Sequence, residues 1–279
     1  MHTTFRFSGI LAALLLFCTP CTALAVPGRI ISLAPSITRQ ICDLHEQDRL
    51  IGVTSFCPQY AEGKEVVGSL TLLNFEKICS LKPDIILAST DCNKKNDIEK
   101  LKKLGMRVEI FEGCESFACM CREFVTLGRL LGKERESQDM ISRIQKELRE
   151  ARSRISDSPK LKVFWQMGTN PLVTASDRTF TGELIGLARC DNIFGGLPAK
   201  YPRINIESVV TENPDVIFIV TDMGNRRPST LIWEPFKGIS AVKNNRVYYI
   251  SGDLVCQPTP GMFIKAFKAV AGRLHPGVM

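Results

Sequence analysis

The chain has 279 residues, of which 44% are apolar, and a formal net charge of +7 at pH 7. Acidic and basic residues are mixed along its length, and no basic block is interleaved with aromatic residues, so the sequence does not indicate a nucleic-acid-binding protein. The charge pattern is typical of a solvated surface, with room for a mild attraction to anionic ligands or lipid surfaces. Beyond the N-terminal segment, no apolar run approaches the roughly 20 residues needed to span a bilayer.

The N-terminal segment has the pattern of a secretory signal peptide. Arg6 provides a basic start, residues 10–17 form an apolar run, and a small-x-small cleavage site ends at Ala25. The bulky Phe17 directly before Cys18 does not fit a lipoprotein signal. We therefore expect an exported protein, and the loss of Arg6 lowers its net charge from +7 to +6.

Short apolar runs alternate with helix-like segments in the N-terminal half. Strands are expected at residues 29–33, 50–53, 85–88 and 108–111. Helices are expected at residues 37–44, 74–81 and 98–104. Ser36 and Asn74 are expected to be N-caps, and Gly105 ends the third helix. This alternation predicts an α/β lobe with a mainly parallel sheet.

Near the middle of the chain, residues 133–156 have the pattern of one long amphipathic helix. Its apolar positions recur at steps of three and four residues: Ile141, Ile144, Leu148, Ala151 and Ile155. No glycine or proline interrupts it before Pro159, and at about 1.5 Å per residue it would be roughly 35 Å long. It is either a surface helix of a single domain or a bridge between two lobes.

Strand and helix alternate again after this long helix. Strands are expected at residues 162–166, 216–220 and 246–250, and helices at 181–188, 205–211 and 261–274. The expected organisation is a signal peptide, an N-terminal lobe, a helical connection and a C-terminal lobe, at residues 1–25, 26–126, 127–158 and 159–279.

An internal repeat favours two related lobes. Each half contains an Asn, a Glu two residues later and a Pro-Asp pair that begins seven residues after the Glu: Asn74, Glu76, Pro83 and Asp84, then Asn205, Glu207, Pro214 and Asp215. The Asn can cap a short helix, the Glu favours the positive N-terminal end of that helix, and the Pro directs the chain into a strand. Two such units on either side of one long helix indicate two lobes bridged by it.

A set of short segments, in this order and spacing, resembles the periplasmic substrate-binding proteins for cobalamin and iron-siderophores that serve ABC importers. The segments are Arg29-Ile-Ile-Ser-Leu-Ala-Pro-Ser, Asn74-Phe-Glu-Lys-Ile, Leu81-Lys-Pro-Asp, Gln166-Met-Gly-Thr-Asn-Pro, Asn192-Ile-Phe, Ile206-Glu-Ser-Val and Asn213-Pro-Asp. The likeness covers nearly all of the mature sequence and is strongest to the cobalamin-binding member. It implies two α/β lobes joined by one rigid helix, a ligand cleft between them and a periplasmic location.

The resemblance also implies roles for single residues. Glu76 and Glu207 fall where the family has one surface carboxylate per lobe that docks into basic pockets of the membrane permease, the partner of an ATPase. Phe56 and Tyr201 fall where the cobalamin-binding member has aromatic side chains in the cleft. The loops expected at the cleft carry Pro35, Phe56, Leu70, Cys92, Thr169, Asn170, Tyr201, Arg203 and Leu254. The protein is expected to be a monomer with no cofactor or metal of its own.

Two departures from the family bear on the ligand. Leu70 stands where an aromatic residue is expected, and residues 254–256 replace an aromatic-rich loop. Fewer flat apolar walls suggest weaker corrinoid binding or another ligand. An anionic siderophore would be favoured by four arginines that are otherwise solvated surface charges: Arg178, Arg203, Arg226 and Arg227. The expected ligand is therefore a corrinoid, or else a ferric siderophore or haem-like chelate.

The cysteines offer an alternative function. Eleven are present, nine remain after processing, and the odd number leaves at least one thiol unpaired or paired between chains. Cys57, Cys92 and Cys114 all follow expected strands, so they are expected to crowd one end of the N-terminal lobe. The spacing of Cys114, Cys119 and Cys121 matches no zinc or iron–sulfur motif. Structural disulfides, inert thiols and an exported redox or metal-binding role all stay open.

Other chemistry has little support. Only His45 and His275 remain after processing, too few for a His-rich zinc or manganese site. Residues 128–133 are one residue short of a P-loop and lie in helical sequence, and no Gly-x-Ser-x-Gly motif is present. We therefore expect a binding protein and not an enzyme.

Overall fold

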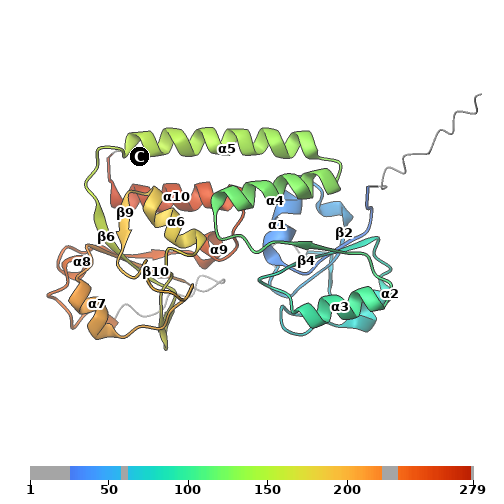
Figure 1. Cartoon of the computed structure of the whole chain (residues 1–279), viewed down its shortest axis with the longest axis horizontal. Helices are drawn as coiled ribbons and strands as arrows, with labels where there is room; N and C mark the ends of the chain where they lie inside the picture. The colour runs from blue at the N-terminus through green and yellow to red at the C-terminus, as the bar shows by residue number, and fades with distance from the viewer. Residues whose placement is uncertain (1–25, 58–61, 222–231, 278–279) are drawn as a thin grey trace, which may run out of the picture.

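The computed structural model describes residues 26–57, 62–221 and 232–277, which form two lobes beneath one long helix (Figure 1). The expected signal peptide, Arg226 and Arg227 lie outside the described residues. The prediction of two α/β lobes with mainly parallel sheets is confirmed. Within the described part of the chain, no helix combines the length and apolar character that crossing a membrane requires.

The N-terminal lobe is built on a five-stranded parallel sheet in the order β3-β2-β1-β4-β5. Its strands are β1 (Ile30–Ser32), β2 (Leu50–Val53), β3 (Glu65–Val66), β4 (Ile85–Ser89) and β5 (Val108–Phe111). Its helices are α1 (Pro35–Asp43), the 3-10 helix η1 (Gln47–Arg49), α2 (Phe75–Ser80) and α3 (Lys95–Lys103). Because all five strands are parallel, the loops that follow them leave the same edge of the sheet.

The C-terminal lobe contains a four-stranded parallel sheet, β11-β10-β6-β9, and a separate antiparallel hairpin, β7-β8. The strands are β6 (Leu161–Gln166), β7 (Gly168–Thr169), β8 (Leu172–Val173), β9 (Cys190–Asn192), β10 (Val216–Val220) and β11 (Val247–Ile250). The helices are α6 (Phe180–Leu187), α7 (Ile206–Glu212), α8 (Ser240–Lys243) and α9 (Gly252–Val255). The strands β7, β8 and β9 were not predicted, because two or three residues are too few to show a period.

Three helices connect the lobes. The long helix α5 (Glu134–Arg154) runs across both lobes, and α4 (Phe117–Leu130) and α10 (Pro260–Leu274) pack beneath it (Figure 1). With 21 residues, α5 is about 32 Å long. The prediction of a long helix near the middle of the chain is confirmed, and this helix bridges the lobes. The lobe limits expected from the sequence, 26–126, 127–158 and 159–279, stay a proposal.

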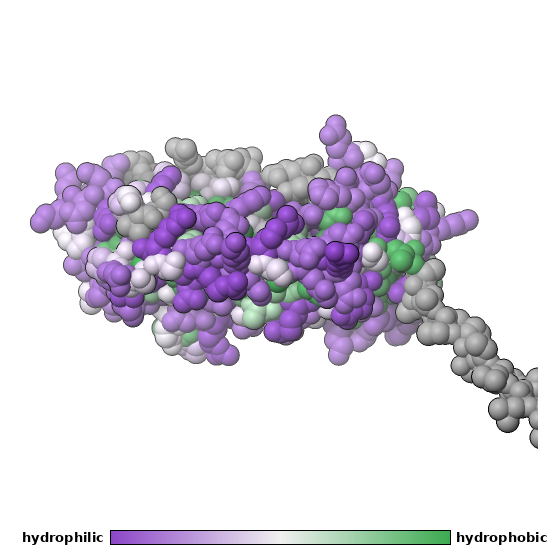
Figure 2. Space-filling view, turned by 90° about the horizontal axis from the view of Figure 1, so that it is seen from above, coloured by the Kyte–Doolittle hydropathy of each residue, from purple (hydrophilic) through white to green (hydrophobic). Residues whose placement is uncertain are grey.

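The apolar core is continuous from one lobe to the other. One cluster joins buried side chains of both sheets with those of the connecting helices, among them Ile30, Phe124, Leu148, Trp165 and Phe267. Two further clusters fill the other face of each sheet. Seen from above, where α5 crosses the molecule, the surface is mainly hydrophilic (Figure 2). The apolar stripe of α5 therefore closes the shared core, while its charged side faces solvent.

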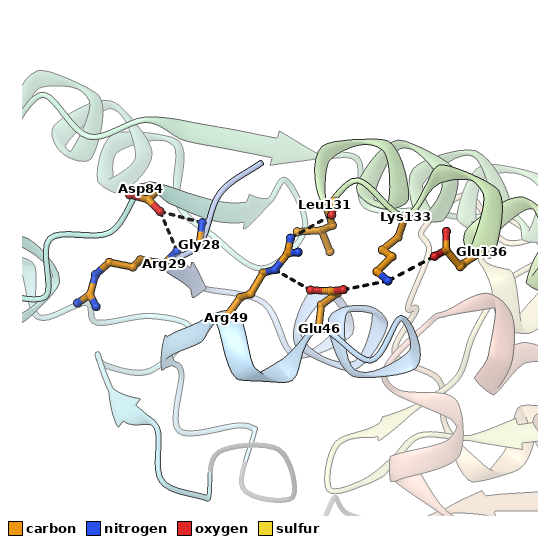
Figure 3. A network of polar contacts seen from close by, with 8 residues as sticks. All are labelled: Gly28, Arg29, Glu46, Arg49, Asp84, Leu131, Lys133 and Glu136. Atoms are coloured by element: carbon orange, nitrogen blue, oxygen red, sulfur yellow. Dashed lines mark hydrogen bonds and ion pairs between the residues drawn. The ribbon is translucent and has the colours of Figure 1, made fainter. Parts of the chain in front are cut away.

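The start of α5 is tied to the N-terminal lobe by charged groups (Figure 3). The carboxylate of Glu46 pairs with Arg49 at 2.7 Å and with Lys133 at 3.5 Å, and Lys133 also pairs with Glu136 at 3.3 Å. Arg49 donates a hydrogen bond to the carbonyl of Leu131 at 3.0 Å. Because the side chain of Glu46 is only 10% exposed, these pairs are partly shielded from water and fix the point at which α5 leaves the lobe.

The sequence repeat has the same local structure in both lobes. The side chains of Asn74 and Asn205 accept hydrogen bonds from the backbone N–H groups of Lys77 and Ser208, at 3.0 and 2.8 Å. The predicted N-cap at Asn74 and the helix start at Asn205 are therefore confirmed.

The Pro-Asp pair repeats as well. The carboxylate of Asp84 accepts hydrogen bonds from the N–H groups of Gly28 and Arg29, both at 2.8 Å (Figure 3). In the other lobe, Asp215 accepts the N–H of Lys162 at 2.9 Å. Each aspartate thus binds the backbone at the beginning of the first strand of its lobe, which explains why the motif occurs twice.

One expected helix start is wrong. Helix α1 begins at Pro35, with Ala34 as N-cap and no capping side chain, so Ser36 lies within the first turn and is not the N-cap. Proline suits this position because the first turn leaves its N–H groups without helical partners, and proline has none to leave.

Lys82 and Asn213, the residues before the two prolines, both have left-handed backbones, with φ of 46° and 49°. Lysine is strained there and asparagine much less so, so Lys82→Asn is expected to raise the free energy of unfolding by about 0.5–1 kcal/mol. Urea denaturation of the mature chain measures it. The control is Lys103→Asn in the last turn of α3, where the backbone is right-handed, and it is expected to lower the free energy of unfolding by about 0.3 kcal/mol. A lower free energy of unfolding in both variants would contradict the backbone explanation.

Candidate functional site

Four residues expected at the cleft lie at one edge of the N-terminal sheet. Pro35 comes after β1, Phe56 after β2, Leu70 after β3 and Cys92 after β4. Phe56 is 40% exposed, Leu70 and Cys92 are half-buried, and Pro35 is buried. Phe56, Leu70 and Cys92 are therefore at least partly accessible at this edge, whereas the buried Pro35 forms the first residue of α1.

The turn after β3 presents an exposed apolar side chain, that of Leu72, which was not expected at the cleft from the sequence. The N–H of Ser69 donates to the carbonyl of Leu72 at 2.8 Å, and the N–H of Leu72 donates to the Ser69 hydroxyl at 3.1 Å. Gly68, at φ +135°, begins this turn, and a Cβ there would overlap the Leu72 carbonyl. The turn is therefore tightly fixed, and Leu72 is 76% exposed at its tip.

The residues expected from the C-terminal lobe lie on three segments. Thr169 and Asn170 are exposed at the tip of the β7-β8 hairpin. Arg203 is exposed and forms an isolated antiparallel bridge with Val173 of β8. Leu254 is half-buried in α9, which follows β11. The hairpin and the Arg203 segment are thus held side by side by backbone pairing.

Tyr201 belongs to the same paired segment and faces charges of the other lobe. It is 48% exposed, and its pKa is raised, first by burial and then by electrostatic interaction with Cys256, Asp91 and Glu115. Asp91 and Glu115 belong to the N-terminal lobe, so this phenol lies near the junction of the lobes. The hydroxyl stays protonated at neutral pH and can donate a hydrogen bond, and the ring can stack.

The lobes touch at the first turn of α4. The ring of Phe117 stacks on that of Phe263 in α10, with 4.8 Å between centroids. The N–H of Phe117 donates to the carboxylate of Glu183 in α6 at 2.6 Å. Glu115, just before α4, forms an ion pair with Lys200. None of these residues was expected at the cleft from the sequence, and the position of Lys200 directly before Tyr201 is the sequence feature that could have indicated its place.

A buried arginine makes a second connection between the lobes. Arg39 of α1 is 9% exposed, and its guanidinium donates to Gln257 at 3.5 Å and lies 3.0 Å from the sulfur of Met262. Burial raises the pKa of Asp43, one turn later, while Arg39 and Lys265 act in the opposite direction. These contacts join α1 of the N-terminal lobe to Gln257 and to the first turn of α10.

One hollow lies between the two lobes, and a larger one lies elsewhere on the surface. A hollow of about 20 Å³ is lined by N-terminal residues such as Asp91 and by Pro258 of the other lobe. A hollow of this size is too small for a metal chelate. A hollow of about 770 Å³ is lined only by α5, α6 and their neighbours, including Arg149 and Arg152, and is separate from the cleft.

Cys57, Cys92 and Cys114 were expected to crowd one end of the N-terminal lobe, and each follows a strand of the N-terminal sheet. Cys57 and Cys92 follow β2 and β4, and both belong to or pack against the core cluster that the lobes share. Burial, followed by the negative charge of Asp91, raises the pKa of Cys92 to about 12. Cys114 is not a free thiol, because it forms a disulfide with Cys119.

These environments do not support thiol chemistry. Reactive thiols have lowered pKa values, whereas burial raises the pKa of Cys190 to about 12 and that of Cys121 to about 11. Among the residues that the structure describes, no group of three His, Cys, Asp or Glu side chains is placed to hold a metal ion. The raised pKa of Cys92 and the disulfide at Cys114 thus give no support to a free-thiol site formed by Cys57, Cys92 and Cys114.

A family model described as periplasmic binding protein matches residues 30–254. The chain belongs to this family. The vitamin B12-binding protein of Pectobacterium atrosepticum is 30% identical over 253 residues, which cover 88% of this chain and 89% of the relative. The vitamin B12-binding protein of Vibrio cholerae is 28% identical over 258 residues, which cover 90% of this chain and 91% of the relative.

Solved structures of other periplasmic binding proteins share the fold. The periplasmic vitamin B12 binding protein BtuF of Vibrio cholerae has a TM-score of 0.77 and 26% identity, over 89% of this chain and 97% of that one. The periplasmic heme binding protein HutB of Vibrio cholerae has a TM-score of 0.79 over 89% and 99% of the two chains, and at 18% identity it shows the fold alone. The same two lobes thus occur in proteins named for vitamin B12 and for heme.

In this periplasmic binding protein, the Cys92 thiol should be nearly inert. At pH 8, iodoacetamide should modify Cys92 roughly a hundredfold or more slowly than a free thiol, because only the thiolate reacts and the pKa is about 12. Asp91→Asn removes one cause of the shift and should speed the modification, which peptide mass spectrometry of the folded chain measures. Asp253→Asn, beside Cys256, should leave Cys92 unaffected. Equal rates at Cys92 with and without Asp91 would refute the electrostatic contribution.

Proposed function

We propose that this chain is the substrate-binding protein of an ABC importer, which captures a corrinoid of the cobalamin type and delivers it to a membrane permease and its ATPase. The protein acts as a monomer in the periplasm after cleavage behind Ala25. The observation that supports this most strongly is the match of up to 90% of the chain to relatives named vitamin B12-binding protein.

The accessible apolar side chains at the mouth of the cleft suit a large, flat ligand. Phe56, Leu72 and Tyr201 are 40%, 76% and 48% exposed; the first two lie on loops after strands of the N-terminal sheet, and Tyr201 lies on a loop of the C-terminal lobe. Exposed apolar groups of this size that gather at a cleft are typical of binding sites. A corrin ring offers a broad face on which aromatic and leucine side chains can pack. In this proposal, Phe56 and Tyr201 face each other across the ligand.

Within the proposed site, each lobe contributes one wall. The first wall contains Phe56, Leu70 and Cys92, and Pro35 supports it from within. The second wall contains Thr169, Asn170, Tyr201, Arg203 and Leu254. Polar groups of the second wall, such as the exposed Arg203, would bind the amide or phosphate groups at the rim of a corrinoid.

A ferric siderophore or haem-like chelate is the second candidate ligand, and one contact weakens the case for the siderophore. The guanidinium of Arg178 donates to the carbonyl of Pro198 at 3.0 Å, so this arginine is engaged in its own lobe. The corrinoid is also favoured by sequence, since the heme-binding protein HutB is only 18% identical.

One experiment tests the proposal directly. The mature chain is purified from its source cells with nothing added, and its absorption and mass spectra are recorded, followed by calorimetric titration with aquocobalamin and with haemin. A co-purified corrinoid, or tighter binding of aquocobalamin, supports the proposal. Tighter binding of haemin, or a co-purified ferric chelate, would reassign the ligand. If the protein binds neither aquocobalamin nor haemin and nothing co-purifies, the proposal is refuted.

Tyr201→Ala should weaken ligand binding by about 1–3 kcal/mol, the scale of a buried aromatic contact. Tyr201→Phe is the matched control, because it keeps the ring and removes only the hydroxyl, and it should retain most of the affinity. Calorimetric titration measures both. If Tyr201 only packs against its own lobe, the alanine variant will lose stability and bind the ligand as well as the wild type.

Charge reversal at Glu76 or Glu207 should reduce transport and leave ligand affinity nearly unchanged, because both carboxylates are exposed and lie outside the cleft. Uptake of labelled ligand and calorimetric titration measure the two effects. Glu212→Lys, at the other end of α7 from Glu207, is the control and should leave uptake intact. If both glutamates only stabilise helix N-termini, reversal will cost about 0.3–1 kcal/mol of stability and uptake will be normal.

A further inference from the structure

The segment that leads into α4, residues 112–119 and called here the α4 turn, is closed on itself. Cys114 and Cys119 form a disulfide across it. Between them, Ser116 is the N-cap of α4, and its hydroxyl accepts the N–H of Cys119 at 3.2 Å. The disulfide and the cap therefore fix the conformation of the residues between the two cysteines.

Those enclosed residues make contacts with the other lobe. Glu115 pairs with Lys200, and the N–H of Phe117 donates to Glu183 at 2.6 Å. The ring of Phe117, 8% exposed, stacks on Phe263 with 4.8 Å between centroids. An ion pair, a hydrogen bond and a ring contact between the lobes thus all come from one loop of six residues closed by one disulfide.

The other end of the α4 turn is seated on the N-terminal lobe. The N–H of Gly113 donates to the hydroxyl of Thr90 at 2.8 Å, and that of Glu112 donates to Glu123 at 3.1 Å. A Cβ on Gly113 would lie 2.6 Å from the Cβ of Asp91, so only glycine permits this close approach. The α4 turn is therefore fixed to one lobe at residues 112–113 and reaches the other through the disulfide-closed part.

We propose that the Cys114–Cys119 disulfide is a redox-sensitive brace that holds the α4 turn in the shape required for contact between the lobes. A dithiol reductant opens it by thiol–disulfide exchange: the S–S bond accepts two electrons and becomes two thiols, while the dithiol becomes a disulfide. The opened turn loses a constraint on the backbone that presents Glu115 and Phe117, so the contacts with Lys200, Glu183 and Phe263 weaken.

The burial of the neighbouring cysteines decides which sulfur atom an external dithiol can attack, and it keeps the nearby Cys121 thiol out of the reaction. Cys114 is half-buried and offers the attacking thiolate a sulfur, while Cys119 is 6% exposed. Cys121, the next thiol in the sequence, is 7% exposed, and burial together with the charge of Glu183 raises its pKa to about 11. It stays protonated at neutral pH and does not attack the disulfide, so an external dithiol is required.

Hydrogen exchange tests the brace. The mature chain is compared before and after treatment with dithiothreitol, with thiol counting by mass spectrometry. Once Cys114 and Cys119 are reduced, the amide of Phe117 should exchange about tenfold or more faster, because loss of a short cross-link frees the local backbone. Peptides of α6 and α10 that hold Glu183 and Phe263 should also exchange faster. Unchanged exchange at Phe117 in the reduced protein would overturn the proposal.

Two variants separate the brace from other thiols. The double variant Cys114→Ser/Cys119→Ser should exchange fast at Phe117 without reductant and should not respond to it. Cys256→Ser, which leaves the disulfide intact, should respond as the wild type does. If the double variant does not fold, Glu115→Gln is measured instead, with the disulfide intact. Hydrogen exchange should then become faster around Lys200, whereas the amide of Phe117 should exchange as slowly as in the wild type. A response to dithiothreitol that persists in the double variant would refute the assignment to this bond.

The consequence for binding rests on the proposed function and has its own readout. With aquocobalamin as the probe, reduction should shift the dissociation constant by about threefold to tenfold, the range of modest coupling between sites. No shift, despite faster exchange at Phe117, would refute the link to affinity. If aquocobalamin binds neither form, the proposed ligand fails, and the exchange measurement still decides whether the brace exists.

Discussion

The shared apolar core beneath α5 is the constraint on which the rest of the structure depends. Each sheet packs one face against its own cluster and the other against a cluster common to both lobes. Side chains of α4, α5 and α10 complete this common cluster, and charged pairs at Glu46 fix where α5 begins. Moving the lobes apart would expose this apolar surface to water, so their relative position is set mainly by hydrophobic burial.

The shared core sets the approximate position of the lobes, and a small number of polar contacts join them in addition. Arg39 connects α1 to the segment before α10, and Glu115 and Phe117 connect the start of α4 to the C-terminal lobe. A surface ion pair such as Glu115–Lys200 contributes little by itself, typically up to about 1 kcal/mol. Its position matters more, because Lys200 directly precedes Tyr201, so the pair connects the segment that holds Tyr201 to the N-terminal lobe.

The thiols separate into two groups with different physical roles. Cys57 and the other buried thiols fill space in the core, and burial raises the pKa of those at Cys92, Cys121 and Cys190. Cys114 and Cys119 are joined at the junction of the lobes. Among the cysteines that the structure describes, Cys57, Cys121 and Cys190 are therefore buried in the core, whereas Cys114 and Cys119 supply a covalent constraint.

The sequence by itself determined the architecture and its repeat. The long helix, the caps at Asn74 and Asn205, and the strand–helix alternation all follow from local periodicity and capping chemistry, which a single segment contains in full. The same holds for the loops at the cleft edge, since parallel strands send them to one side. Errors arose where local signals compete or are too short, as at Ser36 and in the short strand β9.

Only the tertiary structure decided which of those loops meet. The pairing of Cys114 with Cys119 and not Cys121, the exposure of Leu72, and the contact of Glu115 with Lys200 leave no periodic trace in the sequence. The interlobe contacts join residues far apart in the chain, and their distances depend on how the shared core places one lobe against the other. That placement results from the packing of three helices and two sheets at once, and no single segment encodes it.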